Sequence, residues 1–406
     1  MHDPTVRPIA PEELPRFVHA MELAFHDRAS DEGVERERLI AEPERFFVAL
    51  DGDDFVGTAG ACSTHLTVPG PRSLPAAGIT AVGVRASHRR RGINTALMAA
   101  LLDQAAERGE PLVYLWASES AIYGRFGYGM ASFCAELELP TRHGAFVEGT
   151  EMGGRIRLAP RDEALPLMRP VYERVAAWRP GMVAMEDRWW KRLFDERKRD
   201  EDKPTFFALH ESEGVVDGYA VYQVKHEWAH SVPNNELEVQ HLIAATPCAT
   251  ASLWRFLLDI DLIATVKAWD RPADEELLWL AAEPRRMKLI VSDGLWVRLV
   301  DVRRSLEGRG YASDGTVVFD VADRFRPQTT ARYELVVRDG SGSCTRTDAE
   351  PDISCGVDAL GATYLGGVSF RQLARVQQMR ELTPGALARA DVMFASDPSP
   401  WFGFIY

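Results

Sequence analysis

The sequence has few cysteines and no long hydrophobic run. Five cysteines are scattered over 406 residues, and none belongs to a C-x-x-C pair. An odd number of isolated cysteines indicates neither a disulfide framework nor a zinc site, so we expect a reducing, cytoplasmic location. No stretch reaches the roughly 18 apolar residues of a membrane-spanning helix, and the N-terminus lacks a basic segment followed by an apolar one. We therefore predict neither secretion nor membrane insertion.

Basic residues are fewer than acidic ones. The chain contains 47 Lys and Arg against 60 Asp and Glu, a formal net charge of -13. Nucleic acid is therefore an unexpected partner, because phosphate backbones require a basic surface, whereas a cationic substrate fits this charge. Hydrophobic residues make up 46% and charged residues 26%, as in an ordinary globular protein. At about 150 residues per domain, the length predicts two or three domains.

Hydrophobic periodicity in the first third predicts alternating helices and strands. A stretch rich in proline and glycine at 69–78 predicts a connection that leads into a short buried strand at 79–84. A helix should follow at 93–105, because apolar residues recur there every three or four positions, and it should stop at Gly109. The other predicted elements are a helix at 17–25, a hairpin of strands at 46–50 and 55–61, and a strand at 111–117. This order is the βαβ pattern of an α/β protein.

The middle third repeats this order and indicates an internal duplication. After a polar linker at 141–154, the predicted elements are a helix at 165–178, a hairpin of strands at 206–209 and 219–224, a strand at 237–243 and a helix at 251–258. The loop at 245–250, before the last of these helices, contains no basic residue and no glycine. We therefore expect the second copy not to bind a phosphate ligand.

The last third has a different pattern, with short strands and helices that begin near Asp293 and an apolar tail at 401–406. We place the boundaries after residues 145 and 290. The predicted domains are 1–145, 146–290 and 291–406.

The segment Arg89-Arg90-Arg91-Gly92-Ile93-Asn94 joins the strand at 79–84 to the next helix. Backbone N–H groups at the start of such a helix lie at the positive end of its dipole and favour an anion. The glycine lets the backbone approach that anion, and the arginines add charge-assisted contacts to phosphate oxygens. Its position favours a pyrophosphate site over the alternative, a solvated basic turn.

This strand, loop and helix resemble the signature of the GNAT superfamily of N-acetyltransferases, V-x-V-x-P-x-x-R-x-x-G-x-G/A. Residues 82–94 read V-G-V-R-A-S-H-R-R-R-G-I-N, with Ala86 in place of the proline and Asn94 in place of the last small residue. The string W-A-S-E-S-A-I-Y-G-R-F-G-Y-G at 116–129 resembles the Eis (enhanced intracellular survival) acetyltransferases more narrowly. The resemblance continues with L-T-V-P-G at 66–70, D-G-L-W-V-R at 293–298 and Y-L-G at 364–366. It therefore spans the full chain.

The resemblance implies an α/β (α+β) architecture of tandem GNAT folds. The first domain would bind acetyl-CoA, the second would be GNAT-like without a cofactor, and the third would be a sterol-carrier-like α/β domain. The same family implies assembly as a homohexamer.

The resemblance also implies a set of acetyl-CoA contacts in the strand, the loop and the residues after the next strand. They are Val82, Gly83, Val84, Arg90, Arg91, Gly92, Ile93, Asn94, Thr95, Ser118 and Glu119. An open strand edge at 82–84 could bind the pantetheine amides and polarise the thioester carbonyl. Acetyl-CoA is the expected co-substrate. No metal is expected, because His26, His65 and His88 lack ligand spacing.

By the same resemblance, Tyr123 is the expected general acid. A phenol with a reference pKa of about 10 stays protonated at neutral pH and can donate to a departing thiolate. The alternative is a packed aromatic on a short helix. The expected general base is the C-terminal carboxylate, here on Tyr406; its reference pKa of about 3.5 suits a base poorly, but burial of the tail would raise this pKa. The alternative is a tail that only docks for stability.

The family's acceptors are amines of aminoglycosides, often at several positions, with polyamines or protein lysines as alternatives. Asp27 matches a family carboxylate on the substrate side, and Phe25 could line the same wall; a helix end without a ligand is the alternative for both. Ile405 replaces an acid found in some members, which leaves the aminoglycoside range open. A different class of function would be a non-catalytic scaffold that binds lipid or acyl-CoA.

Overall fold

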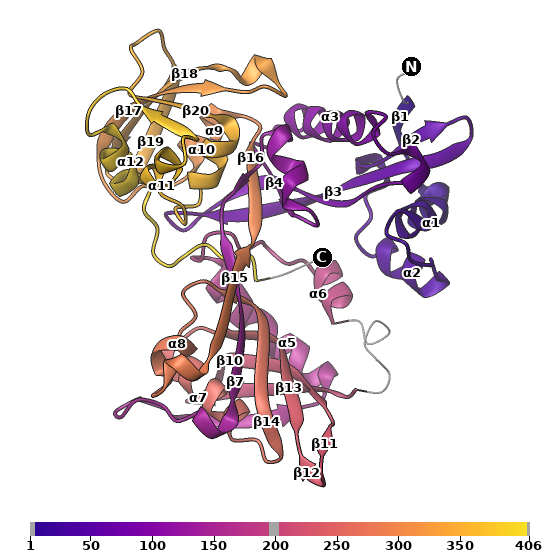
Figure 1. The fold of residues 1–406 in the computed structure, drawn as a ribbon, viewed down its shortest axis with the longest axis vertical. Helices are drawn as coiled ribbons and strands as arrows, with labels where there is room; N and C mark the ends of the chain where they lie inside the picture. The colour runs from indigo at the N-terminus through magenta and orange to yellow at the C-terminus, as the bar shows by residue number, and fades with distance from the viewer. Residues whose placement is uncertain (1–4, 195–202, 404–406) are drawn as a thin grey trace.

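The computed structural model describes residues 5–194 and 203–403, which form three lobes (Figure 1). Each lobe is built on one large sheet, and these sheets have seven, seven and five strands. The N-terminal lobe is at the upper right of Figure 1, the second lobe is below it and the C-terminal lobe is at the upper left.

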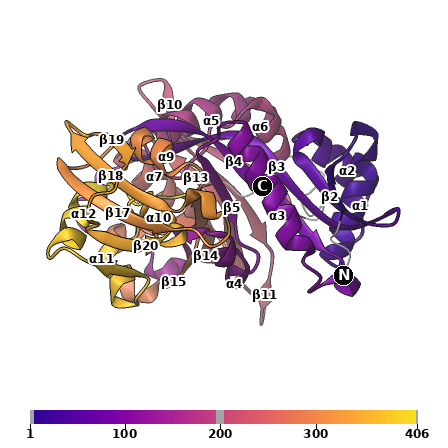
Figure 2. The same ribbon diagram turned by 90° about the horizontal axis from the view of Figure 1, so that it is seen from above.

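The first sheet positions the candidate site. Its strands in spatial order are β1 (Thr5–Pro8), β2 (Phe46–Asp51), β3 (Asp54–Val68), β4 (Arg72–Val84), β5 (Leu112–Trp116), β16 (Leu295–Leu299) and β6 (Gly129–Met130). Strands β4 and β5 are parallel and are connected through helix α3 (Ile93–Glu107). Helix α3 packs closely on β3 at Gly57, where a Cβ atom would lie 2.6 Å from Ile93 Cγ2. The other helices of this lobe are α1 (Leu14–Ala24), α2 (Asp31–Arg38) and α4 (Ser120–Tyr123). Viewed from above, α1 and α2 lie at the opposite end of the molecule from the C-terminal lobe (Figure 2).

The predicted hairpin and the helix after the arginine loop are confirmed, but the predicted connection at 69–78 is wrong. Only residues 69–71 form a turn, because β3 and β4 stay paired as far as Val68 and Arg72. The second lobe holds this extension, since the Thr67 N–H donates a 2.8 Å hydrogen bond to the Met182 carbonyl. Contacts between lobes thus extend the strands through a sequence whose local preference is a loop.

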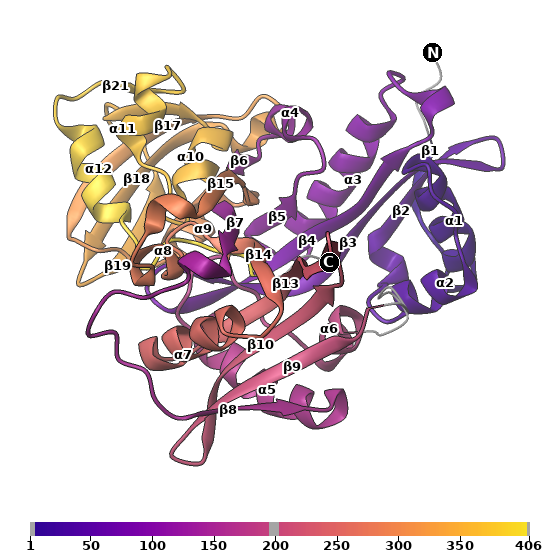
Figure 3. The same cartoon turned by 60° about the horizontal axis from the view of Figure 1, so that its bottom comes forward.

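The second sheet repeats the order of the first. Its strands in spatial order are β15 (Lys288–Asp293), β7 (Phe133–Pro140), β14 (Ile263–Pro272), β13 (Asn235–Ala244), β10 (Val215–Lys225), β9 (Thr205–Ser212) and β8 (Arg155–Ala159). The last three lie at the front of Figure 3. The other elements of this lobe are α5 (Arg161–Ala176), α6 (Asp187–Leu193), α7 (Pro247–Leu258), α8 (Leu277–Leu280) and the hairpin of β11 (Trp228–Ala229) and β12 (Val232–Pro233). The parallel pair β13 and β14 corresponds to β4 and β5, as the duplication predicts.

Two strands lie in the sheet of the neighbouring predicted domain, and β15 itself spans the boundary predicted after residue 290. Strand β7 precedes residue 145 but lies in the second sheet, between β14 and β15. Strand β16 follows residue 290 but lies in the first sheet, where Val297 pairs with Tyr114. These exchanges are long-range pairings, and hydrophobic periodicity carries no signal for them.

The C-terminal lobe has a five-stranded sheet, with strands in spatial order β19 (Ser341–Arg346), β18 (Ala331–Arg338), β17 (Gly315–Ala322), β20 (Ile353–Gly356) and β21 (Met379–Glu381). Its helices are α9 (Val302–Gly308), α10 (Val357–Thr363), α11 (Phe370–Arg375) and α12 (Ala386–Phe394). The rings of Phe370 and Phe394 pack edge to face, with centroids 4.8 Å apart. A fully buried ion pair of 2.6 Å between Arg298 on β16 and Asp323 joins this lobe to the first sheet.

The segment after α12 returns to the other two lobes. The Trp401 indole N–H donates to the Asp270 carbonyl of the second lobe at 3.0 Å, and the ring of Phe402 lies 5.6 Å from that of Tyr114 in the first sheet. The C-terminal segment thus reaches the junction of the lobes. Within residues 5–194 and 203–403, no helix is long and apolar enough to cross a membrane.

Candidate active site

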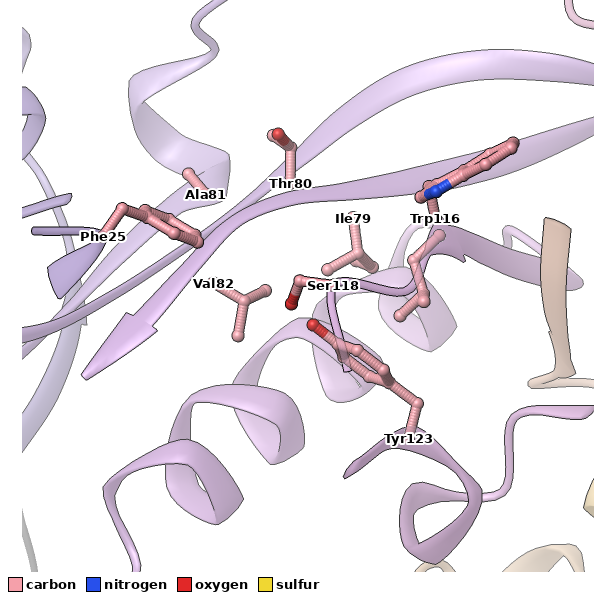
Figure 4. Close-up of a pocket in the computed structure, with 9 residues that line it drawn as sticks. Phe25, Ile79, Thr80, Ala81, Val82, Trp116, Ser118 and Tyr123 are labelled. Atoms are coloured by element: carbon pink, nitrogen blue, oxygen red, sulfur yellow. The ribbon is translucent and has the colours of Figure 1, made fainter. Parts of the chain in front are cut away.

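The candidate site lies where β4 and β5 stop pairing. Their register runs from Ala76 with Leu112 to Gly78 with Tyr114, and a cavity of about 160 Å³ follows between the two strands (Figure 4). The cavity is lined by Phe25, Ile79, Thr80, Ala81, Val82, Leu115, Trp116, Ser118 and Tyr123. This is the carboxyl edge of a parallel strand pair, where α/β proteins commonly bind ligands.

A β-bulge shapes β4 at this cavity. Thr58 pairs with Gly83 and Gly60 pairs with Thr80, so one residue of β3 faces two residues of β4. Within the bulge Ala81 has a left-handed φ of 55°, and the Thr58 hydroxyl donates a 2.9 Å hydrogen bond to the Ala81 carbonyl. A bulge of this kind bends the strand and re-aims its backbone groups.

The predicted cofactor residues Val82, Gly83 and Val84 complete this strand. Val82 lines the cavity. Gly83 faces the end of α1, and a Cβ atom there would lie 2.8 Å from the Cβ of Ala24. The glycine therefore lets α1, and with it Phe25, approach the strand.

The loop between β4 and α3 has the geometry of an anion-binding turn. Gly92 precedes the helix with a φ of 81°, a conformation that favours glycine, and no described side chain caps this helix. A Cβ atom on Gly92 would meet nothing within 4 Å, so the approach to the helix start is open. The Ile93 side chain is buried beneath the turn, whereas Thr95 is exposed. The positive end of α3 is therefore accessible to a negatively charged group.

The arginines of this loop differ in their surroundings. Arg91 contacts the Asp51 carboxylate at 3.3 Å, and Arg89 lies 3.9 Å from Glu119. Arg90 is exposed and has a φ of 63°. Two of the three charges are thus partly balanced, and Arg90 is the one best placed to meet a phosphate.

Asn94 has an unsatisfied polar atom at the start of α3. Its side-chain Oδ1 is buried and has no hydrogen-bond partner within the described part of the chain. A buried acceptor without a donor costs about 1–3 kcal/mol. The loop therefore fits a ligand that brings an N–H or O–H donor together with phosphate groups.

Tyr123 forms the side of the cavity opposite β4. Only 4% of the residue is exposed, and its hydroxyl points toward Ser118 (Figure 4). Burial raises the pKa of the phenol, a hydrogen bond with the Ser118 side chain offsets part of this rise, and the Glu119 charge adds to it. The raised pKa keeps the phenol protonated at neutral pH, so that it can act as a proton donor.

The structure separates the two predicted substrate residues. Phe25 lines the cavity with Tyr123. Asp27 lines a different depression, together with Arg16 and Arg85, and its carboxylate accepts a 2.7 Å hydrogen bond from the Arg28 N–H. Asp27 therefore takes part in a local turn, and the structure does not bring it into the cavity.

Tyr406 lies outside the described residues. The nearest described aromatic residue of the tail is Phe402, which is 1% exposed, and its ring centroid lies 6.5 Å from that of Trp116 at the cavity. The tail segment therefore approaches the cavity from the junction between the lobes.

Trp116 and Thr58 are not among the site residues that the sequence predicts. Trp116 ends β5 and lines the cavity; an aromatic residue at the end of a predicted parallel strand is a signal that could have identified it. Thr58 acts through the bulge on β4, and since this depends on strand register, the sequence contains no signal for it.

In the second lobe, the loop that corresponds to the phosphate loop lies against a carboxylate of the chain itself. The Thr246 hydroxyl caps α7 by accepting a 3.1 Å hydrogen bond from the Ala249 N–H, and it donates a 3.0 Å hydrogen bond to the Asp217 carboxylate. Asp217 also contacts His210. A carboxylate of the chain thus lies at the helix start where a phosphate would bind, which agrees with the predicted loss of cofactor binding.

Residues 5–194 and 203–403 contain no group of three or more His, Cys, Asp or Glu that could hold a metal ion. The polar groups that line the active-site cavity are the hydroxyls of Thr80, Ser118 and Tyr123 and the backbone of β4.

Comparison with protein families gives three matches along the chain. Residues 5–131 match one GNAT acetyltransferase domain, residues 181–303 match a second, and residues 302–403 match a sterol carrier protein domain. The first match contains the loop, the cavity and Tyr123. The chain is therefore an N-acetyltransferase of the GNAT type, with tandem GNAT folds followed by a sterol-carrier-like domain.

Relatives define the family more closely. An uncharacterized N-acetyltransferase of Streptomyces avermitilis is 43% identical and is aligned over 90% of this chain and 91% of its own. The N-acetyltransferase Eis of Mycobacterium tuberculosis is 34% identical over 92% of both chains. The crystal structure of Eis1 from Mycobacterium abscessus is similar with a TM-score of 0.88 and 32% identity, and covers 99% of this chain and 100% of its own. The protein belongs to the Eis family of N-acetyltransferases.

Proposed function

We propose that this protein transfers acetyl groups from acetyl-CoA to primary amines of a cationic acceptor, and that aminoglycosides are acetylated at several positions. The observation that carries the proposal is the Tyr123 hydroxyl, which points into a cavity bounded by the bulged strand β4 and the end of β5 (Figure 4). The net charge of -13 favours a polycationic acceptor over an anionic one.

The cofactor would follow β4 and the start of α3. Arg90, Arg91 and the N–H groups from Gly92 to Thr95 would hold its phosphates, because the positive helix end and the guanidinium groups converge there. Val82, Gly83 and Val84 would bind its amide groups, and a donor from the pantetheine arm would satisfy the orphaned Asn94 Oδ1. Ser118 and Glu119 close the other side of this site.

Acetyl-CoA supplies the activated acetyl thioester in this scheme. The acceptor amine attacks the carbonyl carbon while the C–S bond breaks, and Tyr123 gives its phenolic proton to the departing sulfur. A backbone N–H of β4 stabilises the charge that develops on the carbonyl oxygen. The proton lost by the amine would pass through water to the C-terminal carboxylate of Tyr406, the base that the family resemblance implies.

The test is to incubate the purified protein with acetyl-CoA and separate panels of aminoglycosides, polyamines and lysine peptides. Free thiol is followed with time, and products are identified by mass. We expect thiol release with aminoglycosides and mass gains of more than one acetyl group. Thiol release only with polyamines or peptides would make those amines, and not aminoglycosides, the acceptor class. Binding of acetyl-CoA without thiol release on any acceptor would favour the scaffold function.

We also propose a homohexamer. Large apolar side chains on the second lobe support self-association, since Trp279 is 77% exposed and Ile290 is 61% exposed. Light scattering on the purified chain should give six times the mass of 45.3 kDa, and a monomer mass would contradict this part of the proposal.

A further inference from the structure

A second cavity lies between the first and C-terminal lobes. It has a volume of about 370 Å³ and lies between the C-terminal end of α3, the start of α9 and strands β18 and β19. Its charged lining residues are Glu110, Asp301, Arg303, Arg304, Arg326 and Arg346. In Figure 1, α3 and α9 are on the facing sides of the two lobes.

The charge of this cavity is opposite to that of the whole protein. Four guanidinium groups and two carboxylates line it, and with Glu307 and Asp103, which pair with two of these arginines, and Arg45, which pairs with Glu110, the formal charge is +1. Both oxygens of Glu110 accept 2.7 Å hydrogen bonds from the buried Arg45, which balances that carboxylate. In a chain of net charge -13, such a cavity concentrates anions locally.

The four arginines keep donors for a ligand beside the hydrogen bonds that position them, although Arg326 also faces the Gln328 side chain and Arg346 the ring of Tyr333. The hydrogen bonds are Arg303 with Glu307 at 3.2 Å, Arg304 with the Gly109 carbonyl at 2.8 Å, Arg346 with the Gln328 carbonyl at 3.0 Å, and Arg326 with Asp103 at 2.5 Å. Each of them occupies one N–H group, whereas a guanidinium has five. The cavity therefore presents several oriented donors that its own residues leave unused.

We propose that this cavity binds a small anion with phosphate groups. Guanidinium forks match phosphate oxygens in a bidentate geometry, and four of them converge here from three segments of the chain. The buried residues Val302 and Thr329 line the cavity as well, so the contacts are partly shielded from water. The anion would bridge α3 and the C-terminal lobe and stabilise their packing.

This site is separate from the phosphate loop of the proposed active site. The loop lies at the first residue of α3, and the second cavity lies at its C-terminal end, from Ala106 onward. A helix of 15 residues is about 22 Å long, so one pyrophosphate group cannot reach both sites.

Calorimetric titration with sodium pyrophosphate tests the proposal on three full-length proteins. They are the wild type, the double variant Arg303→Gln/Arg346→Gln and, as the matched control, Arg90→Gln/Arg91→Gln. The four substituted arginines are exposed, so the variants should fold, and thermal melting checks this. We expect a binding event that persists in the loop control but weakens at least tenfold in Arg303→Gln/Arg346→Gln.

Equal pyrophosphate binding by the wild type and Arg303→Gln/Arg346→Gln would overturn the proposal, as would loss of all binding in the loop control. Thermal melting gives a second readout, because a ligand of the native state raises the melting temperature. Pyrophosphate should raise it in the wild type and the loop control, and by a smaller amount in Arg303→Gln/Arg346→Gln, which keeps only the phosphate loop. If that double variant does not fold, the single variant Arg346→Gln replaces it, with the same expected loss.

Discussion

The phenolic hydroxyl of Tyr123 lies beside the hydroxyl of Ser118 in the cavity between β4 and β5 (Figure 4). The two residues come from consecutive segments, since Ser118 follows β5 and Tyr123 ends α4. We propose that the Ser118 hydroxyl orients the phenol, while burial keeps the phenol protonated. Ser118 is therefore a positioning residue for the proposed proton transfer.

Replacement of this hydroxyl should weaken catalysis more than cofactor binding. We expect Ser118→Ala to lower kcat about tenfold while KM for acetyl-CoA stays within about threefold, since a misdirected acid acts mainly in the transition state. Steady-state kinetics measure both constants. Ser120→Ala, in the same exposed segment, is the control and should match the wild type. A KM effect without a kcat effect would contradict the positioning role.

The phosphate loop should be sensitive at Gly92. Alanine there is strained at a φ of 81°, and the shifted backbone would misplace the N–H groups that hold the phosphates. We expect Gly92→Ala to raise KM for acetyl-CoA about tenfold. Gly52→Ala is a matched control, because Gly52 also has a positive φ of 61° and open space around its Cβ position. It should cost similar stability, about 1 kcal/mol, without a change in KM.

Asp270 should make stability depend on pH. Burial raises the pKa of its carboxyl from 3.8 to about 7, and its Oδ1 has no hydrogen-bond partner among the described residues. Because the folded pKa lies above the unfolded one, the native state binds the extra proton. Stability should therefore fall as the pH rises from about 4 to about 7 and stay low above that range.

Asp270→Asn removes this titration. Urea unfolding of both proteins measures the difference. From about pH 4 to about pH 7 the free energy of unfolding of the wild type should fall, relative to that of the variant, by up to about 4 kcal/mol, because one pKa unit corresponds to about 1.4 kcal/mol. Parallel pH profiles for the two proteins would show that the native carboxyl titrates normally.

The buried ion pair of Arg298 and Asp323 should be important for the junction of the lobes. Both side chains are 0% exposed, so loss of one charge leaves the other buried and unpaired. We expect Asp323→Asn to destabilise the protein by about 3–5 kcal/mol in thermal or chemical unfolding. Glu35→Gln, which removes an exposed pair with Arg38, should cost less than about 1 kcal/mol. Similar losses for both variants would contradict this account.

Local sequence patterns predicted the parts of the site that are local in structure. The loop, its Gly92 and the helix after it follow from charge, glycine and apolar spacing, and the structure places them as expected. The resemblance to Eis proteins drew attention to Tyr123 and Ser118, and the structure brings both to one cavity.

Features that depend on distant segments could not be predicted in this way. The length of β4 depends on its pairing with β3 and on the second lobe, and the places of β7 and β16 depend on exchange between sheets. Asp27 matched a family position, yet a hydrogen bond from the next residue keeps its carboxylate in a local turn. The role of Thr58 appears only once the register of the bulge is known.

The most direct test of the central claim is the kcat of Tyr123→Phe at saturating acetyl-CoA, with cofactor binding measured on the same protein. Tyr128→Phe is the matched control, because this neighbouring phenol is also buried but donates to the Met98 sulfur at 3.3 Å. A general acid contributes about a hundredfold or more, so kcat of Tyr123→Phe should fall by at least that factor with unchanged cofactor binding, while Tyr128→Phe stays within a few-fold of the wild type. Equal kcat values for Tyr123→Phe and the wild type would contradict the assignment of Tyr123 as the proton donor.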